Sequence, residues 1–122
     1  MDGKYYLGCP VWACPDWVGS LFSTKDRKKW LSEYSSVFGT VEGNSTFYGL
    51  PALDTVKRWA DSSSEGFRFC LKFPKAISHD RRLIDAEVET GLFLDILKVL
   101  ADAYRLGPSF LQLPPTFSAV EM

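Results

Sequence analysis

Four polar side chains lie near the ends of segments that predict β-strands, and their types suit acid/base chemistry: Glu42, Asn44, Lys72 and Gln112. A carboxylate can accept a proton from a substrate, and a lysine can donate one, stabilise an oxyanion or form a Schiff base. Glu42 and Lys72 are therefore the candidate catalytic residues. The side-chain amides of Asn44 and Gln112 are candidates for binding a ligand in the same place.

The pair of opposite charges also has a structural interpretation. Glu42 and Lys72 fall on neighbouring predicted strands, and barrel interiors can contain buried ion pairs whose members only satisfy one another. The sequence slightly favours a functional role, because four polar groups converge on one end of the predicted sheet. Both interpretations stay open at the level of the sequence.

Four short segments bounded by Gly or Pro predict the strands: residues 4–9, 39–44, 67–73 and 109–113. Side chains i and i+2 share one face of a strand. The face toward the helices should hold the apolar residues Val41, Phe67, Phe69, Leu71, Phe73, Leu111 and Leu113. The opposite face should hold the four polar residues together with Thr40, Arg68, Cys70 and Phe110, and Gly8 should leave room there for a ligand.

Three helices are expected between these strands: residues 25–38 capped by Ser23 or Thr24, a shorter helix capped by Asp54, and residues 86–105. The alternating order predicts a parallel sheet with right-handed crossovers. A (β/α) barrel of TIM type needs roughly 250 residues. We therefore expect residues 1–122 to be the N-terminal half of one such α/β domain, with about four strands and three helices of a half-barrel.

Four residues in the predicted loops could also contact a ligand. Trp12 and Trp17 follow the first strand, where rings can stack on sugars or bases, although we favour a role in folding the loop onto the core. The hydroxyl of Tyr48 could reach a ligand from the second loop. His79 lies in the third loop near a lysine and two arginines, a set that could bind a phosphate or carboxylate, or simply be solvated.

Composition limits the classes of partner. The net charge is −1, which gives no overall attraction to nucleic acid or to an anionic membrane, and no apolar stretch approaches the roughly 20 residues of a membrane span. Three cysteines without CxxC spacing argue against a disulfide framework and a structural zinc site, so we expect a cytoplasmic protein. One histidine and one inward carboxylate do not make a metal site, and no motif indicates a cofactor.

Several blocks of the sequence resemble the YecE-like domain-of-unknown-function family, number seventy-two in that series. They comprise residues 6–12, 17–19, 38–48, Pro51, Trp59, 66–69, Lys72, Pro74, His79, 106–108, 112–115 and Phe117. The run Val-Glu-Gly-Asn-Ser-Thr-Phe-Tyr is the most specific of them. The resemblance implies a TIM barrel of about twice this length, with no reaction assigned. The Cys9-Pro10 pair departs from the Gly-Thr/Ser stretch of many relatives, which removes a first-loop hydroxyl.

Three functions are compatible with these features. The first is an enzyme that acts on a small polar metabolite, with or without a phosphate, by acid/base chemistry at the barrel mouth. The second is a metal enzyme of the sugar-isomerase or endonuclease type, with its ligands in later strands. The third is a non-catalytic binding or scaffolding barrel. In each case we expect either the other half of a barrel or self-association to cover the open sheet edges.

Overall fold

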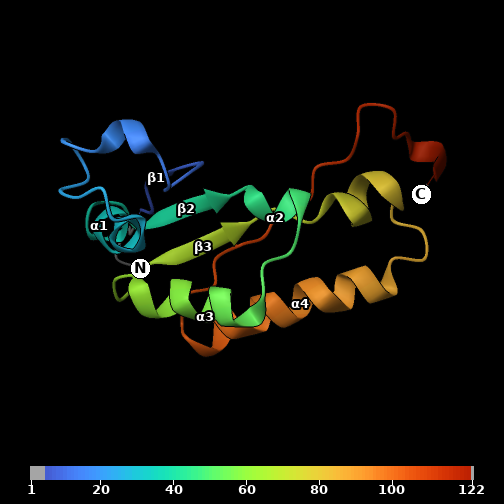
Figure 1. Cartoon of the computed structure of the whole chain (residues 1–122). Helices are drawn as coiled ribbons and strands as arrows, with labels where there is room; N and C mark the ends of the chain where they lie inside the picture. The colour runs from blue at the N-terminus through green and yellow to red at the C-terminus, as the bar shows by residue number, and fades with distance from the viewer. Residues whose placement is uncertain (1–4, 122) are drawn as a thin grey trace.

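A computed structural model describes residues 5–121 and contains a parallel sheet of three strands in the order β1-β2-β3. The strands are β1 (Gly8–Cys9), β2 (Thr40–Gly43) and β3 (Arg68–Leu71). All four residues of β2 pair in register with those of β3, from Thr40 with Arg68 to Gly43 with Leu71. The mixed α/β architecture with a parallel sheet confirms the prediction at that level (Figure 1).

Helices connect the strands and cover one face of the sheet (Figure 1). The α-helices are α1 (Trp30–Val37), α2 (Ser45–Tyr48), α3 (Leu53–Ser62) and α4 (Glu87–Asp102). Single 3₁₀ turns span Pro15–Trp17, Arg27–Lys29 and Ala119–Glu121, and a π-helical turn spans Ala76–Asp80. α3 and α4 run side by side beneath the sheet in Figure 1. No helix within residues 5–121 is long and apolar enough to cross a membrane.

The starts of two helices differ from the prediction. The helical segment after Thr24 begins at Arg27 as a 3₁₀ turn, and Asp26 caps it by accepting a hydrogen bond from the Lys28 amide at 3.1 Å. Thr24 instead accepts a bond from the amide of Asp26, so it orders the capping residue. In α3, Ala52 occupies the N-cap position, and Asp54, which we expected there, lies inside the first turn. Both differences shift a boundary and leave the helix in place.

The predicted fourth strand, residues 109–113, is wrong as a regular strand. The chain from Leu106 to Phe110 runs parallel to β3 and its continuation but pairs at only two isolated bridges, Leu106 with Phe69 and Phe110 with Lys72. The two bridges are three residues apart on the side of β3 and four residues apart on the other side, so residues 106–110 contain one extra residue, as in a β-bulge. Pro108 lies in the interruption and has no N–H to give to the ladder.

The alternation of strand faces is confirmed in β2 and β3. Val41, Phe69 and Leu71 are fully buried on the face of the sheet that packs against the helices. On the opposite face, Glu42 is exposed and Lys72 is half-buried. Phe110 pairs with Lys72 and therefore lies on the expected face away from the helices. Leu111, expected against the helices, is exposed, because the pairing with the sheet ends at Phe110.

A buried tyrosine joins β1 to β2. The hydroxyl of Tyr34, on α1, accepts a hydrogen bond from the Cys9 amide at 2.7 Å and donates one to the Thr40 carbonyl at 2.8 Å. Burial raises the pKa of Tyr34 to about 12. Gly8 lies beside this junction with its α-hydrogens against β2, since a Cβ there would collide with the Thr40 carbonyl oxygen. Gly8 therefore allows the two strands to approach each other. The expectation that Gly8 leaves room for a ligand is wrong, because the Thr40 carbonyl fills that space.

Candidate functional site

A groove of about 330 Å³ opens at the C-terminal ends of β1 and β2. The loop after β1 forms one wall through residues 10–13, and the end of β2 with the start of α2 forms the other. Four of the predicted site residues line it: Trp12, Glu42, Asn44 and Tyr48. In parallel α/β proteins this end of the sheet is where ligands bind. The groove is therefore the candidate functional site.

Two residues set the polarity of the groove. The side-chain amide of Asn44 donates a hydrogen bond to the Glu42 carboxylate, from Nδ2 to Oε2 at 3.3 Å. Glu42 is exposed, because it lies on the face of β2 away from the helices. A carboxylate oriented by an amide and open to solvent can accept hydrogen bonds from ligand hydroxyl or amino groups.

Lys72 does not form an ion pair with Glu42 within the described part of the chain. Its ammonium lies over the ring of Phe47, with Nζ 4.1 Å from the ring centroid. Such a cation–π contact holds the amine in place without cancelling its charge. Glu42 and Lys72 thus remain two separate charged groups at the ends of adjacent strands, and the ion pair required by the structural interpretation is not formed.

Phe47 also contacts the histidine predicted for the site. The rings of Phe47 and His79 meet edge to face with centroids 5.0 Å apart, and His79 Nδ1 lies 2.8 Å from the Ser78 hydroxyl. Tyr48 packs against Phe47 in the same manner, at 5.0 Å, but is itself 83% exposed. One phenylalanine therefore gathers three of the predicted site residues around its ring: Tyr48, Lys72 and His79.

A second hollow of about 360 Å³ lies on the other side of α2. Phe47 and Tyr48 form one wall, and the π-helical turn Ala76–Asp80 contributes Ala76 and Asp80 to another. Tyr48 lines both this hollow and the groove that contains Glu42, so the two spaces adjoin the same residue.

Thr46 is a positioning residue that the sequence analysis did not single out. It is fully buried, and its hydroxyl lies 2.8 Å from the Lys72 carbonyl and 3.3 Å from the Gly43 carbonyl. It thereby joins the end of β2 to the end of β3 at the level of the candidate site. A Ser-Thr pair directly after a strand is a signal for such side-chain to backbone bonding.

The two predicted loop tryptophans have different positions. Trp17 packs in the core, stacked on Tyr34 at 6.3 Å and tilted against Phe22 at 5.8 Å, away from the residues that line the groove. Trp12 contacts the buried Phe69 edge to face at 5.9 Å and also lines the groove. Both rings fold the first loop onto the core, the interpretation favoured from the sequence.

The last predicted site residue, Gln112, is exposed and is not part of the groove wall. It lies beyond the bridge at Phe110, where the pairing with the sheet ends, so no strand directs its side chain toward the groove. Within residues 5–121 the structure contains no group of three or more His, Cys, Asp or Glu side chains that could hold a metal ion.

Comparisons with known proteins agree on one family. A family model described as "Protein of unknown function DUF72" matches residues 6–122. The UPF0759 protein YecE of Escherichia coli K12 is 39% identical over 117 residues, covering 96% of this chain and 40% of YecE. The UPF0759 protein YunF of Bacillus subtilis is 29% identical over 118 residues, covering 92% of this chain and 40% of YunF. The chain thus spans about 40% of the length of these curated relatives.

Two solved structures share the fold. A DUF72 family protein from Enterococcus faecalis V583 superposes with a TM-score of 0.75 at 27% identity, over 93% of this chain and 41% of that protein. A DUF72 family protein from Thermotoga maritima superposes with a TM-score of 0.74 at 24% identity, over 93% of this chain and 46% of that protein. The architecture described above is therefore that of the matching part of these proteins.

Proposed function

Because the chain belongs to the DUF72 family, we propose that it forms part of a parallel (β/α) barrel of TIM type that binds a small polar metabolite at the C-terminal ends of its strands. The parallel order β1-β2-β3 with helical crossovers supports this architecture. So does the match to solved DUF72 structures that are more than twice as long as the matched part.

The observation that carries the metabolite site is the groove between the first loop and the end of β2. Its polar groups are few and placed together: the Glu42 carboxylate held by Asn44 and the exposed phenol of Tyr48. Its remaining wall is largely apolar, with Trp12 presenting an indole. Small-molecule sites combine an apolar wall with a few convergent polar groups in this way. Sugars and hydroxy acids have hydroxyl groups that can donate hydrogen bonds to such a carboxylate.

In this proposal Glu42 acts as a general base or hydrogen-bond acceptor, and Lys72 supplies the positive charge. The Lys72 ammonium lies over Phe47 and forms no ion pair with the Glu42 carboxylate among the described residues, so both charges are open to a ligand. A substrate that loses a proton to Glu42 could place its developing negative charge toward Lys72. His79, on another edge of the same phenylalanine, is a further group for an anionic substituent.

A thermal-shift screen with sugars, sugar phosphates and hydroxy acids would test this proposal. A ligand at a hundred times its Kd stabilises the folded chain by about 2.7 kcal/mol, which is roughly a 10 °C rise in Tm for this length. Glu42→Gln and Lys72→Met should each remove the shift while changing the Tm of the free protein little, because one side chain is exposed and the other half-buried.

Glu65→Gln is the matched control, since Glu65 is an exposed carboxylate before β3, away from the C-terminal ends of the strands. It should keep the full shift. A metabolite that stabilises the Glu42 and Lys72 variants as much as the native chain would place the ligand outside this groove. Unfolding of both variants without ligand would instead show that the two residues serve stability.

A further inference from the structure

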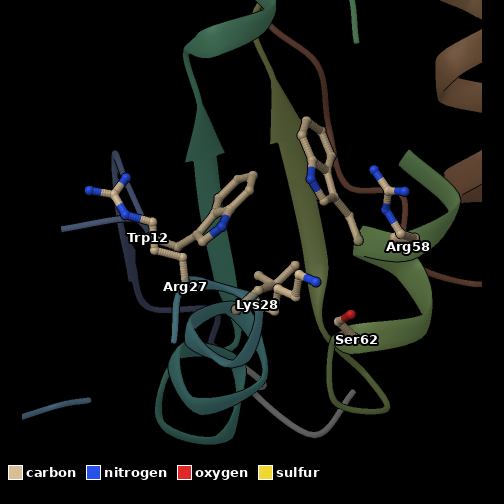
Figure 2. A pocket seen from close by; sticks show the side chains of 7 residues that line it. Trp12, Arg27, Lys28, Arg58 and Ser62 are labelled. Atoms are coloured by element: carbon tan, nitrogen blue, oxygen red, sulfur yellow. The ribbon is translucent and has the colours of Figure 1, made fainter. Parts of the chain in front are cut away.

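A different groove lies between the start of α1 and the middle of α3 (Figure 2). Its volume is about 470 Å³, within the range of sites for small molecules. Seven residues line it: Trp12, Arg27, Lys28, Leu31, Arg58, Trp59 and Ser62. We call it the basic groove. Apart from Trp12, none of these residues lines the groove that contains Glu42.

Three of the seven lining residues carry a positive charge, and none of the seven carries a negative one. Within residues 5–121, no carboxylate lies within 4.0 Å of the cationic groups of Arg27, Lys28 or Arg58. Two of the cations are held by neutral partners: Arg58 donates to the Thr55 hydroxyl at 3.2 Å, and the Arg27 guanidinium lies 5.1 Å from the Trp30 ring. No ion pair among the described residues therefore ties up these three exposed charges.

Two indoles form the wall behind these charges. Trp12 and Trp59 meet nearly perpendicular, with centroids 5.1 Å apart, and both contact the buried ring of Phe69. Figure 2 shows the Trp12 ring in front of the sheet, with the Lys28 side chain below it and Arg58 on α3. The contacts with Phe69 and between the two indoles hold both rings on one side of the groove. The half-buried indoles keep part of their surface for the groove.

We propose that the basic groove binds a small ligand that joins a phosphate group to a flat ring, as a nucleoside monophosphate does. Arginine forks and a lysine suit phosphate oxygens, which accept several hydrogen bonds from such groups. An indole surface suits a planar ring. The Ser62 hydroxyl, at the end of α3, can bond a sugar or phosphate oxygen. Apart from the shared Trp12 wall, this site uses none of the residues that line the metabolite groove proposed above.

AMP, adenosine and inorganic phosphate are the probes that separate the two parts of the ligand. The readout is the set of indole N–H signals in the ¹⁵N-labelled chain, which has four tryptophans. AMP should move the signals of Trp12 and Trp59 and leave that of the core residue Trp17 in place. AMP should bind at least about tenfold more tightly than either adenosine or phosphate, because only AMP contacts both the cationic side chains and the indoles. Raising the salt concentration should weaken the binding of AMP more than the binding of adenosine.

Arg58→Gln should weaken the affinity for AMP about tenfold and leave the affinity for adenosine unchanged. Lys57→Gln is the matched control: it removes one charge from the next residue of α3, which lines a different hollow. The proposal is overturned if AMP at millimolar concentration moves neither signal. It is overturned equally if adenosine or phosphate binds as tightly as AMP, or if both substitutions weaken AMP by the same factor.

Discussion

Removing one oxygen atom from the core should measurably loosen the first strand. Tyr34→Phe keeps the buried ring but deletes the hydroxyl that accepts from the Cys9 amide at 2.7 Å and donates to the Thr40 carbonyl at 2.8 Å. Each hydrogen bond contributes about 1 kcal/mol, and a polar group left without a partner adds to the loss. We therefore expect the free energy of unfolding to fall by about 2–3 kcal/mol, or the Tm by roughly 10 °C.

Urea unfolding followed by circular dichroism would measure this difference, with Tyr104→Phe as the control because Tyr104 is 79% exposed.

The loss of stability in Tyr34→Phe should also depend on pH. The pKa of Tyr34 is raised from 10.0 to about 12, so the folded state holds the proton more tightly than the unfolded state. The difference in the free energy of unfolding between the native chain and Tyr34→Phe is therefore complete below pH 10 and is lost as the pH rises through about 12. A variant as stable as the native chain at pH 7 would refute the role given to this hydroxyl.

Further predictions concern two strand junctions, one helix glycine and the state of assembly. Thr46→Val should cost about 1–2 kcal/mol in urea unfolding, because the hydroxyl at 2.8 Å from the Lys72 carbonyl is fully buried; an unchanged midpoint would contradict it. Gly8→Ala should destabilise by about 2–3 kcal/mol through the collision with the Thr40 carbonyl, whereas Gly91→Ala, in a helix with open space, should stabilise by about 0.5–1 kcal/mol. Light scattering after size exclusion should find dimers or larger assemblies that cover the open sheet edges, and a cooperatively folded monomer would refute this.

The sequence predicts most of the sheet because burial and alternation determine it. Val41, Phe69 and Leu71 follow a period of two and are fully buried, which places Glu42 and Lys72 on the other face. The same rule fails for Gln112, because the pairing with the sheet ends at Phe110 and the predicted strand does not continue to residue 112. Alternation in the sequence predicts the face of a residue only where the chain is paired as a strand.

The contacts of the candidate site were less predictable than its location. Glu42 and Lys72 lie on adjacent strands, and the sequence left open whether they form a pair. The answer depends on Phe47, which the short helix α2 places beneath the ammonium. The basic groove was missed for a related reason. Arg27, Lys28 and Arg58 are separated along the chain, and only the packing of α1 near α3 brings them to one hollow.

Trp12 is a wall shared by two grooves, through which their ligands can be coupled. This indole lines both the groove of Glu42 and the basic groove. If a ligand in one groove requires a different rotamer of Trp12, it changes the work needed to fill the other groove. Thermodynamic reciprocity then makes the change in affinity the same in both directions. Titrating each ligand in the presence of the other would measure this coupling, and affinities that do not change would show that the indole stays fixed.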